Sequence, residues 1–265
     1  MLNRPCEMSG RSSVTVLSAP IDVLDLDNAS ARIQAWARQR ESRYVCFVNV
    51  HALVAATHQR SFARVLRRAD MNMPDGAPVA WMQRRLGYPA QARVSGPDLM
   101  WHYCRLAAAT GESIFLYGST SATLESLQAM LGKAFPGLRI AGAISPPFRE
   151  LTQEEDRDVV NRINTSGAGL VWVGLGCPRQ EQWMAAHRGR VHAVMVGVGA
   201  AFDFHAGAIK RAPLWWRSHG LEWLYRLWCE PGRLWRRYLV TNTLFVLYAA
   251  YQLLFKRGRV RKEQG

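Results

Sequence analysis

Between residues 14 and 209, short apolar runs alternate with longer stretches in which apolar side chains recur at helical spacing. The short runs predict strands and the longer stretches predict helices, because strands buried on both faces are apolar throughout. The predicted strands are residues 14–17, 44–48, 71–73, 113–117, 138–143, 170–173 and 193–196; the clearest helices are residues 120–134 and 154–164, with others starting at Asp27 and near Pro178. This alternation is typical of an α/β fold: a mostly parallel sheet with flanking helices in a Rossmann-like arrangement.

From about residue 210 the pattern changes to helices only. Residues 221–228 and 232–255 predict two helices separated by Glu230-Pro231, and the second contains a run, residues 239–255, without a charged side chain. A membrane-spanning helix needs about 20 apolar residues and carries its flanking positive charge mostly on one side, whereas this run has 17 residues and basic clusters at both ends. We therefore expect a helix that lies in the membrane interface. A helix packed on the α/β domain and a spanning helix are the alternatives.

The pattern divides the chain into a flexible N-terminus (residues 1–13), an α/β domain (residues 14–209) and a helical, membrane-associating appendage (residues 210–265). The 265 residues include 34 Lys and Arg against 20 Asp and Glu, a net charge of +14. The appendage contains 12 of these basic residues, three acids and five of the ten tryptophans, so it carries +9 of the net charge. Such a surface predicts an anionic partner: a phosphorylated substrate, a nucleic acid or a membrane.

Composition narrows the class of protein further. A hydrophobic fraction of 49% excludes a disordered chain. The five cysteines are scattered and form no C-x-x-C pair, which argues against a zinc site and a disulfide framework and favours a reducing compartment. Near the N-terminus there is no apolar run long enough for a signal peptide.

Polar residues follow two of the predicted strands, where ligands bind in open α/β sheets. Asp75, in Pro74-Asp75-Gly76, is a candidate general base; the alternative is an ordinary turn, which these three residue types favour. Asn49 is a candidate hydrogen-bonding group for a sugar or nucleotide, and its alternative is a helix N-cap.

Further candidates lie in loops and glycine turns. Arg93 precedes a helix at Leu99 and suits a phosphate, unless it is a solvated surface arginine. Asp203 is a candidate acceptor for sugar hydroxyls, or a local turn or cap residue. Helix N-termini behind the glycine turns would stabilise an anion. The glycines at these turns are Gly118, Gly174, Gly176 and Gly199.

The spacing of metal-ligating residues predicts no metal site. Asp25-Leu26-Asp27 is formally a D-x-D motif, but it precedes a predicted helix, and Asp27 is better interpreted as that helix's cap. The G-x-G turn at Gly174 lacks the third glycine of a dinucleotide fingerprint, and no Walker lysine follows.

Several of these motifs occur together in one order. After Asn49, Pro74-Asp75-Gly76 and the loop at residues 93–99 come Tyr117-Gly118-Ser119 and a strand–turn–helix segment at residues 173–181 that contains P-R-Q-E. Gly197 to Asp203, K-R-A-P at residues 210–213 and G-L-E-W-L-Y-R-L at residues 220–227 follow. Over residues 14–238 this order resembles the WecG/TagA/CpsF family of bacterial glycosyltransferases.

The resemblance implies an inverting, metal-independent enzyme without a cofactor. It would move a hexose or an N-acetylhexosamine-type sugar from a UDP-sugar onto a polyprenyl-diphosphate-linked sugar, in cell-surface or exopolysaccharide synthesis. It would act as a peripheral protein at the cytoplasmic face of the bacterial plasma membrane, with the α/β domain binding the UDP-sugar. The donor sugar stays open between N-acetylmannosamine, its uronic acid and glucose.

The resemblance also implies roles for individual residues. Asp75 matches the family's base, and Asn49, Arg93 and Gln180 match its sugar and phosphate contacts. A threonine that some members carry two residues before the asparagine is replaced here by Phe47. The appendage arginines expected at the acceptor's diphosphate are Arg226, Arg233 and Arg236.

Two other functions fit parts of the sequence. A nucleic-acid-binding protein would explain the basic charge and the interleaved Arg and Trp, but no RRM, KH or helix-turn-helix signature is present, so we expect no nucleic-acid partner. A non-catalytic UDP-sugar sensor would share the donor pocket but would show no turnover. The sequence leaves the oligomeric state open and allows a homo-oligomer.

Overall fold

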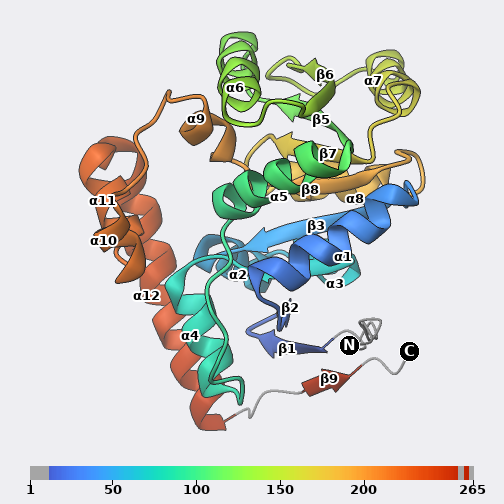
Figure 1. The fold of residues 1–265 in the computed structure, drawn as a ribbon. Helices are drawn as coiled ribbons and strands as arrows, with labels where there is room; N and C mark the ends of the chain where they lie inside the picture. Colours follow the sequence, from blue (N-terminus) through green and yellow to red (C-terminus); the bar gives the residue numbers. More distant parts are fainter. Residues whose placement is uncertain (1–11, 256–259, 263–265) are drawn as a thin grey trace, which may run out of the picture.

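The computed structural model describes residues 12–255 and 260–262 and places them in two sheets with flanking helices (Figure 1). The main sheet has six parallel strands in the order β4-β3-β8-β7-β5-β6. These strands are β3 (Arg43–Val48), β4 (Met71–Pro74), β5 (Ser113–Gly118), β6 (Arg139–Ile144), β7 (Leu170–Gly174) and β8 (Val194–Gly197). The predicted α/β fold with a mostly parallel sheet is therefore confirmed, and each of the six strands was predicted to within a residue or two.

Nine helices among the described residues up to His205 connect or flank these strands. They are α1 (Leu26–Arg38), α2 (Val50–His58), α3 (Arg60–Arg68), α4 (Ala77–Arg85), α5 (Gly96–Thr110), α6 (Ser121–Ala134), α7 (Gln153–Thr165), α8 (Arg179–His187) and α9 (Ala201–His205). Buried residues of α2, α3, α7 and α8 cover one face of the sheet, and those of α1, α5, α6 and α9 cover the other. Alternate residues of β3 show this division: Tyr44 and Cys46 join the first core, Val45 and Phe47 the second. Two buried faces explain why the central strands are apolar along most of their length.

Helix α1 begins two residues earlier than a cap at Asp27 would allow. Its N-cap is Asp25, whose Oδ1 accepts a hydrogen bond from the Asn28 backbone N–H at 2.7 Å. The prediction that Asp27 caps this helix was therefore wrong. Asp27 lies in the first turn instead, where a carboxylate interacts favourably with the helix dipole.

A second, antiparallel sheet joins the two ends of the described chain. Strands β1 (Ser12–Val16) and β2 (Ala19–Asp22) form a hairpin, and β9 (Val260–Lys262) pairs with the other edge of β1. The prediction of helices only after residue 210 was wrong at β9, because this three-residue basic strand owes its conformation to pairing with β1 rather than to an apolar pattern. Of the predicted flexible residues 1–13, only Ser12 and Ser13 lie within the described chain.

The remaining helices are α10 (Leu214–Ser218), α11 (Glu222–Cys229) and α12 (Pro231–Phe255), and α12 runs along the side of the α/β domain (Figure 1). It contacts α2, and the residues buried along it are Leu234, Thr241, Phe245, Ala249 and Gln252. Its opposite face exposes large apolar side chains, namely Leu239, Val240, Val246, Leu247, Leu254 and Phe255. Within the described residues one segment, Leu234–Phe255, is long and apolar enough to cross a membrane by length and composition. The inner face of α12 therefore matches the alternative of a helix packed on the α/β domain. The outer face of α12 is apolar enough to associate with a membrane.

Candidate active site

The carboxyl ends of the parallel strands bring Asn49 and Asp75 together. Asn49 follows β3 and caps α2, since its side chain accepts from the Ala52 backbone N–H at 3.1 Å. Asp75 follows the neighbouring strand β4, and its backbone N–H donates to the Val48 carbonyl at 3.1 Å. The Asn49 side chain also hydrogen bonds to the Asp75 carboxylate. Asn49 is therefore both the helix cap and a contact of the candidate base.

Several charges surround Asp75, which is half-buried. Loss of hydration raises the pKa of its carboxyl to about 6, and the nearby Glu222 carboxylate adds to this rise. Arg93, Arg226 and the Asn49 hydrogen bond act in the opposite direction and lower the pKa. A carboxyl with this pKa is largely ionised at neutral pH and still basic enough to take a proton.

A glycine of the appendage explains how its acidic and basic side chains reach Asp75. Gly220 has a φ of 73° and lies against α4, where a β-carbon on it would come within 2.6 Å of the Ala77 Cβ. This close approach places the start of α11 beside the Asp75 turn. Glu222 and Arg226, both on α11, consequently act on the Asp75 carboxylate.

The four predicted glycines fall into two groups. Gly118 and Gly174 pair across β5 and β7, and a β-carbon on Gly118 would lie 2.5 Å from the Gly174 carbonyl oxygen. They allow close approach of the backbones at the sheet edge. Gly176, with a φ of 78°, has open space where a β-carbon would be, and Gly199 lies beside the Gln180 side-chain oxygen. The second pair borders the open end of the sheet.

Gln180 lies in the first turn of α8 and is 4% exposed. Its Nε2 donates to Glu181 Oε1 at 2.8 Å and to the Gly197 carbonyl at 3.2 Å. Its Oε1 has no hydrogen-bond partner among the described residues and lies next to Gly199. A fixed amide with a free, buried acceptor is suited to a hydroxyl or N–H donor of a ligand, because burial without a partner is costly.

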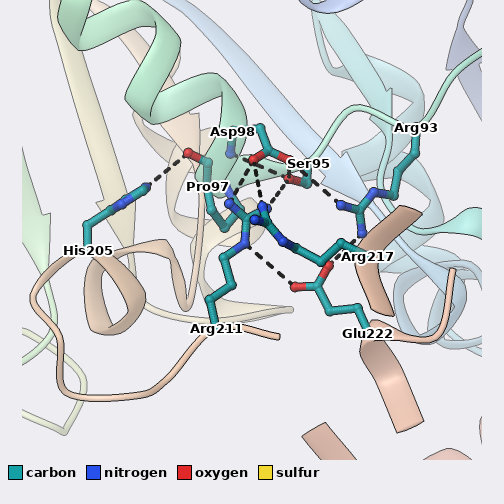
Figure 2. A network of polar contacts seen from close by, with 8 residues as sticks. All are labelled: Arg93, Ser95, Pro97, Asp98, His205, Arg211, Arg217 and Glu222. Carbon is teal, nitrogen blue, oxygen red and sulfur yellow. Dashed lines mark hydrogen bonds and ion pairs between the residues drawn. The ribbon is translucent and has the colours of Figure 1, made fainter. Parts of the chain in front are cut away.

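Arg93 belongs to a network of ion pairs and hydrogen bonds that was not predicted from the sequence (Figure 2). Its Nη1 lies 2.6 Å from Glu222 Oε2, and its Nη2 lies 3.7 Å from Asp98 Oδ2. Arg211 and Arg217 join the same carboxylates, so three arginines and two acids converge. Loss of hydration would lower the pKa of Arg93, but the hydrogen bond and charge of Glu222 outweigh it and raise the pKa. Arg93 is therefore a paired, charged residue rather than a solvated one.

Three members of this network lie within the motifs of the family resemblance, although no role was predicted for them: Asp98, Arg211 and Glu222. Arg217 lies outside these motifs. No spacing rule joins them, because they come from the start of α5, the segment before α10 and the start of α11. The only sequence signal was the concentration of arginine after residue 210.

The structure separates the appendage arginines predicted at the acceptor. Arg226 reaches the site: its positive charge acts to lower the pKa of Asp75, and its guanidinium lies 5.6 Å from the centre of the Phe204 ring. Arg236 lies over the Trp235 ring at 5.2 Å and shows no contact with the site residues described above. Its neighbour Arg237 lies close enough to His51 and Cys177 for its positive charge to act on both side chains. The side chain of Arg233 lies outside the described residues.

Asp203 lies in the first turn of α9, at the edge of the same end of the sheet. Its backbone carbonyl accepts from the Ile209 N–H at 3.2 Å, which links α9 to the segment that leads into the appendage. A carboxylate at this position interacts favourably with the helix dipole, which fits the alternative of a local turn or cap residue. Its role toward a sugar stays a prediction.

Among residues 12–255 and 260–262, no group of three or more His, Cys, Asp and Glu side chains is placed to hold a metal ion. The acidic side chains at the site alternate instead with arginines. The arrangement therefore offers one basic carboxylate, hydrogen-bonding amides and several guanidinium groups at the same edge of the sheet.

Comparison with known proteins finds related sequences along most of the chain. The model of the glycosyl transferase WecG/TagA/CpsF family matches residues 14–259. An N-acetylglucosaminyldiphosphoundecaprenol N-acetyl-beta-D-mannosaminyltransferase of Bacillus spizizenii is 32% identical over 202 residues, 76% of either chain. The Staphylococcus aureus protein of the same name is 28% identical over 235 residues, 86% of this chain and 90% of its own.

Proposed function

The chain belongs to the WecG/TagA/CpsF family of glycosyl transferases, and from this we propose that it transfers an N-acetylhexosamine-type sugar from a UDP-sugar to polyprenyl-diphosphate-linked N-acetylglucosamine. The names of the Bacillus and Staphylococcus relatives support the acceptor and make N-acetylmannosamine the first donor sugar to test. The observation that carries the proposal is Asp75, a carboxylate with a raised pKa that lies at the open end of a parallel sheet, close to Arg93 and Arg226.

We propose a single displacement at the anomeric carbon. The acceptor hydroxyl attacks that carbon, the bond from the carbon to the UDP oxygen breaks, and Asp75 takes the proton from the hydroxyl. One base and one displacement invert the configuration of the sugar. Asn49 supports this step because its hydrogen bond to Asp75 stabilises the ionised carboxylate that accepts the proton.

Departing UDP carries developing negative charge, which needs donors that are already in place. Arg93 provides a guanidinium beside Asp75, and the open turn at Gly176 leads into the N-terminus of α8. Gln180 provides a free oxygen for a sugar or uridine donor group. These cationic and dipolar groups support a reaction without a metal ion or other cofactor.

The appendage supports action at a membrane surface, which we propose to be the cytoplasmic face. The outer face of α12 exposes large apolar side chains, and Trp215, Trp228 and Trp235 are also exposed. Tryptophan prefers the headgroup region, where its ring is buried and its N–H is hydrated. A peripheral position would bring the acceptor's diphosphate to Arg226 while its polyprenyl chain stays in the bilayer.

The decisive experiment is transfer to a synthetic lipid-diphosphate N-acetylglucosamine, with UDP-N-acetylmannosamine, its uronic acid and UDP-glucose as donors. Asp75→Asn is expected to lower kcat at least roughly 100-fold, because general-base catalysis contributes about that much or more. Asp158→Asn, which changes an exposed carboxylate of α7, is the matched control and should keep the wild-type rate.

Two further measurements test the mechanism. NMR of the product should show the inverted anomer, and a chelator should leave the rate unchanged. Full activity of Asp75→Asn would remove the proposed base, and a rate that depends on added metal would overturn the metal-independent step. No turnover with any UDP-sugar would favour the sensor function. The nucleic-acid-binding alternative gains no support from the family or the relatives.

A further inference from the structure

The arginines of the network beside Asp75 have more N–H donors than the carboxylates of the network can accept. Arg93 comes from the loop before α5, Arg211 from the segment before α10, and Arg217 from α10 itself (Figure 2). Each guanidinium has five N–H groups. Asp98 pairs with all three arginines, and Glu222 pairs with Arg93 and Arg211.

Asp98 is held in place by several contacts. Its Oδ1 lies 2.7 Å from Arg211 Nη1 and 3.7 Å from Arg217 Nη1, and its Oδ2 accepts from the Ser95 hydroxyl. Loss of hydration would raise the pKa of Asp98, but the hydrogen bonds from Arg211 and Ser95 together lower it. Asp98 also belongs to the first turn of α5, so its carboxylate is held by the helix and by the arginines.

Glu222 differs from Asp98 because it belongs to another element: it is the first residue of α11. Its Oε2 lies 2.6 Å from Arg93 Nη1, and its Oε1 lies 3.9 Å from Arg211 Nε. The two oxygens of one carboxylate thus bridge two guanidinium groups, as two oxygens of a phosphate would. Its contact with Arg93 is the shortest that Arg93 makes in the network.

Donors without a hydrogen bond remain in the same place. The Nε atoms of Arg211 and Arg217 are buried and have no hydrogen-bond partner among the described residues, since the 3.9 Å from Arg211 Nε to Glu222 Oε1 is too long for a hydrogen bond. The Nε of Arg226, which acts on Asp75 from α11, is also buried without one. Buried N–H groups on charged side chains are costly to leave unpaired, so their convergence points to an anion with several acceptor oxygens.

We propose that Arg93, Arg211 and Arg217 form a diphosphate-binding site, in which a bound diphosphate displaces the Glu222 carboxylate from Arg93. The exchange is favourable because a diphosphate offers more charge and more acceptor oxygens than one carboxylate, in the geometry that guanidinium forks pair with. The inference rests on the proposed function only for the origin of the ligand, which is the diphosphate of the UDP-sugar or of the lipid acceptor.

Isothermal titration of the full chain with inorganic pyrophosphate tests the site without turnover. Arg211→Gln and Arg217→Gln should each weaken binding roughly tenfold or more, as expected for the loss of a charge-assisted hydrogen bond. Glu222→Gln should tighten it, because the competing carboxylate is gone; this gain cannot come from a misfolded variant. Arg149→Gln is the control, since Arg149 pairs with Glu155 on the exposed surface of α7.

Wild-type pyrophosphate affinity in both arginine variants, or weaker binding in Glu222→Gln, would overturn the proposal. Steady-state kinetics of Arg211→Gln identifies the origin of the ligand: a higher KM for the UDP-sugar assigns the site to the donor, and a higher KM for the lipid assigns it to the acceptor. If wild type transfers no sugar but the pyrophosphate affinities change as expected, the site stands and the proposed function fails.

Discussion

At the scale of single residues, the environment of Asp75 decides what it can do. A solvated aspartate has a pKa near 3.8, whereas loss of hydration and the neighbouring Glu222 raise the pKa of Asp75 to about 6. Arg93, Arg226 and Asn49 prevent a larger rise. The balance matters because an efficient general base needs a pKa close to the working pH.

This balance predicts how the transfer rate depends on pH. Asp75 accepts a proton only when it is ionised, so kcat/KM should rise as the pH rises through about 6. A single group with this pKa implies a rate at pH 5 that is roughly one tenth of the rate at pH 7. The measurement is kcat/KM in buffers of constant ionic strength from pH 5 to 8. A profile that is flat from pH 5 to 7 would contradict the assignment of Asp75 as the base.

At the scale of elements, one polar residue fastens the apolar helix α12 to the small sheet. Gln252 is 7% exposed. Its Nε2 donates to the Thr15 carbonyl at 2.7 Å, and its Oε1 accepts from the Leu17 backbone N–H at 2.8 Å. Gln252 thus pairs with the β1–β2 turn as a neighbouring strand would. The contact explains a glutamine in a run that is otherwise mostly apolar.

Gln252→Leu should lower the free energy of unfolding by about 1–3 kcal/mol, because it leaves the half-buried Leu17 N–H and Thr15 carbonyl without this partner. Urea unfolding followed by circular dichroism measures the change. Thr243→Val on the exposed face of the same helix is the control and should stay within about 0.5 kcal/mol of wild type. Equal stability of the two variants would show that Gln252 does not hold α12 in place.

At the scale of the whole molecule, α12 has two apolar faces with different surroundings. Phe245 and Ala249 pack into the core beside α2, while Val246 and Leu247 are exposed between them. Deleting the helix would therefore uncover the core as well as remove the outer face. Substitutions on the outer face alone separate membrane association from folding.

Replacing both Val246 and Leu247 by Glu should weaken binding to vesicles that contain anionic lipid at least roughly tenfold, since each side chain contributes about 1.5–3 kcal/mol when buried. Co-sedimentation with phosphatidylglycerol vesicles measures the binding. Met130→Glu and Phe148→Glu, at exposed apolar residues of the α/β domain, form the control pair. Wild-type sedimentation of the double α12 variant would contradict a membrane-facing role for this surface.

Much of the α/β core could be predicted because the central strands β3, β5, β7 and β8 are buried on both faces and are therefore apolar along most of their length. The four-residue strand β2 and the three-residue β9 were missed, since short strands next to a turn or within a basic segment carry no such signal. Arg236 and Arg237 show the same limit on a helix. Adjacent residues differ by about 100° around the axis, and only packing decides which of them faces the site.

The sequence by itself determined the types of the core elements and placed Asn49 and Asp75 at strand ends, because hydrophobic period and turn chemistry are properties of neighbouring residues. Only the tertiary structure decided which charges meet. Arg93 and Glu222 are separated by 129 positions in the chain and lie 2.6 Å apart. Such a contact depends on the path of every element between them, on the docking of Gly220 against Ala77 and on the burial that sets the pKa of Asp75. The site is in this sense a property of the fold.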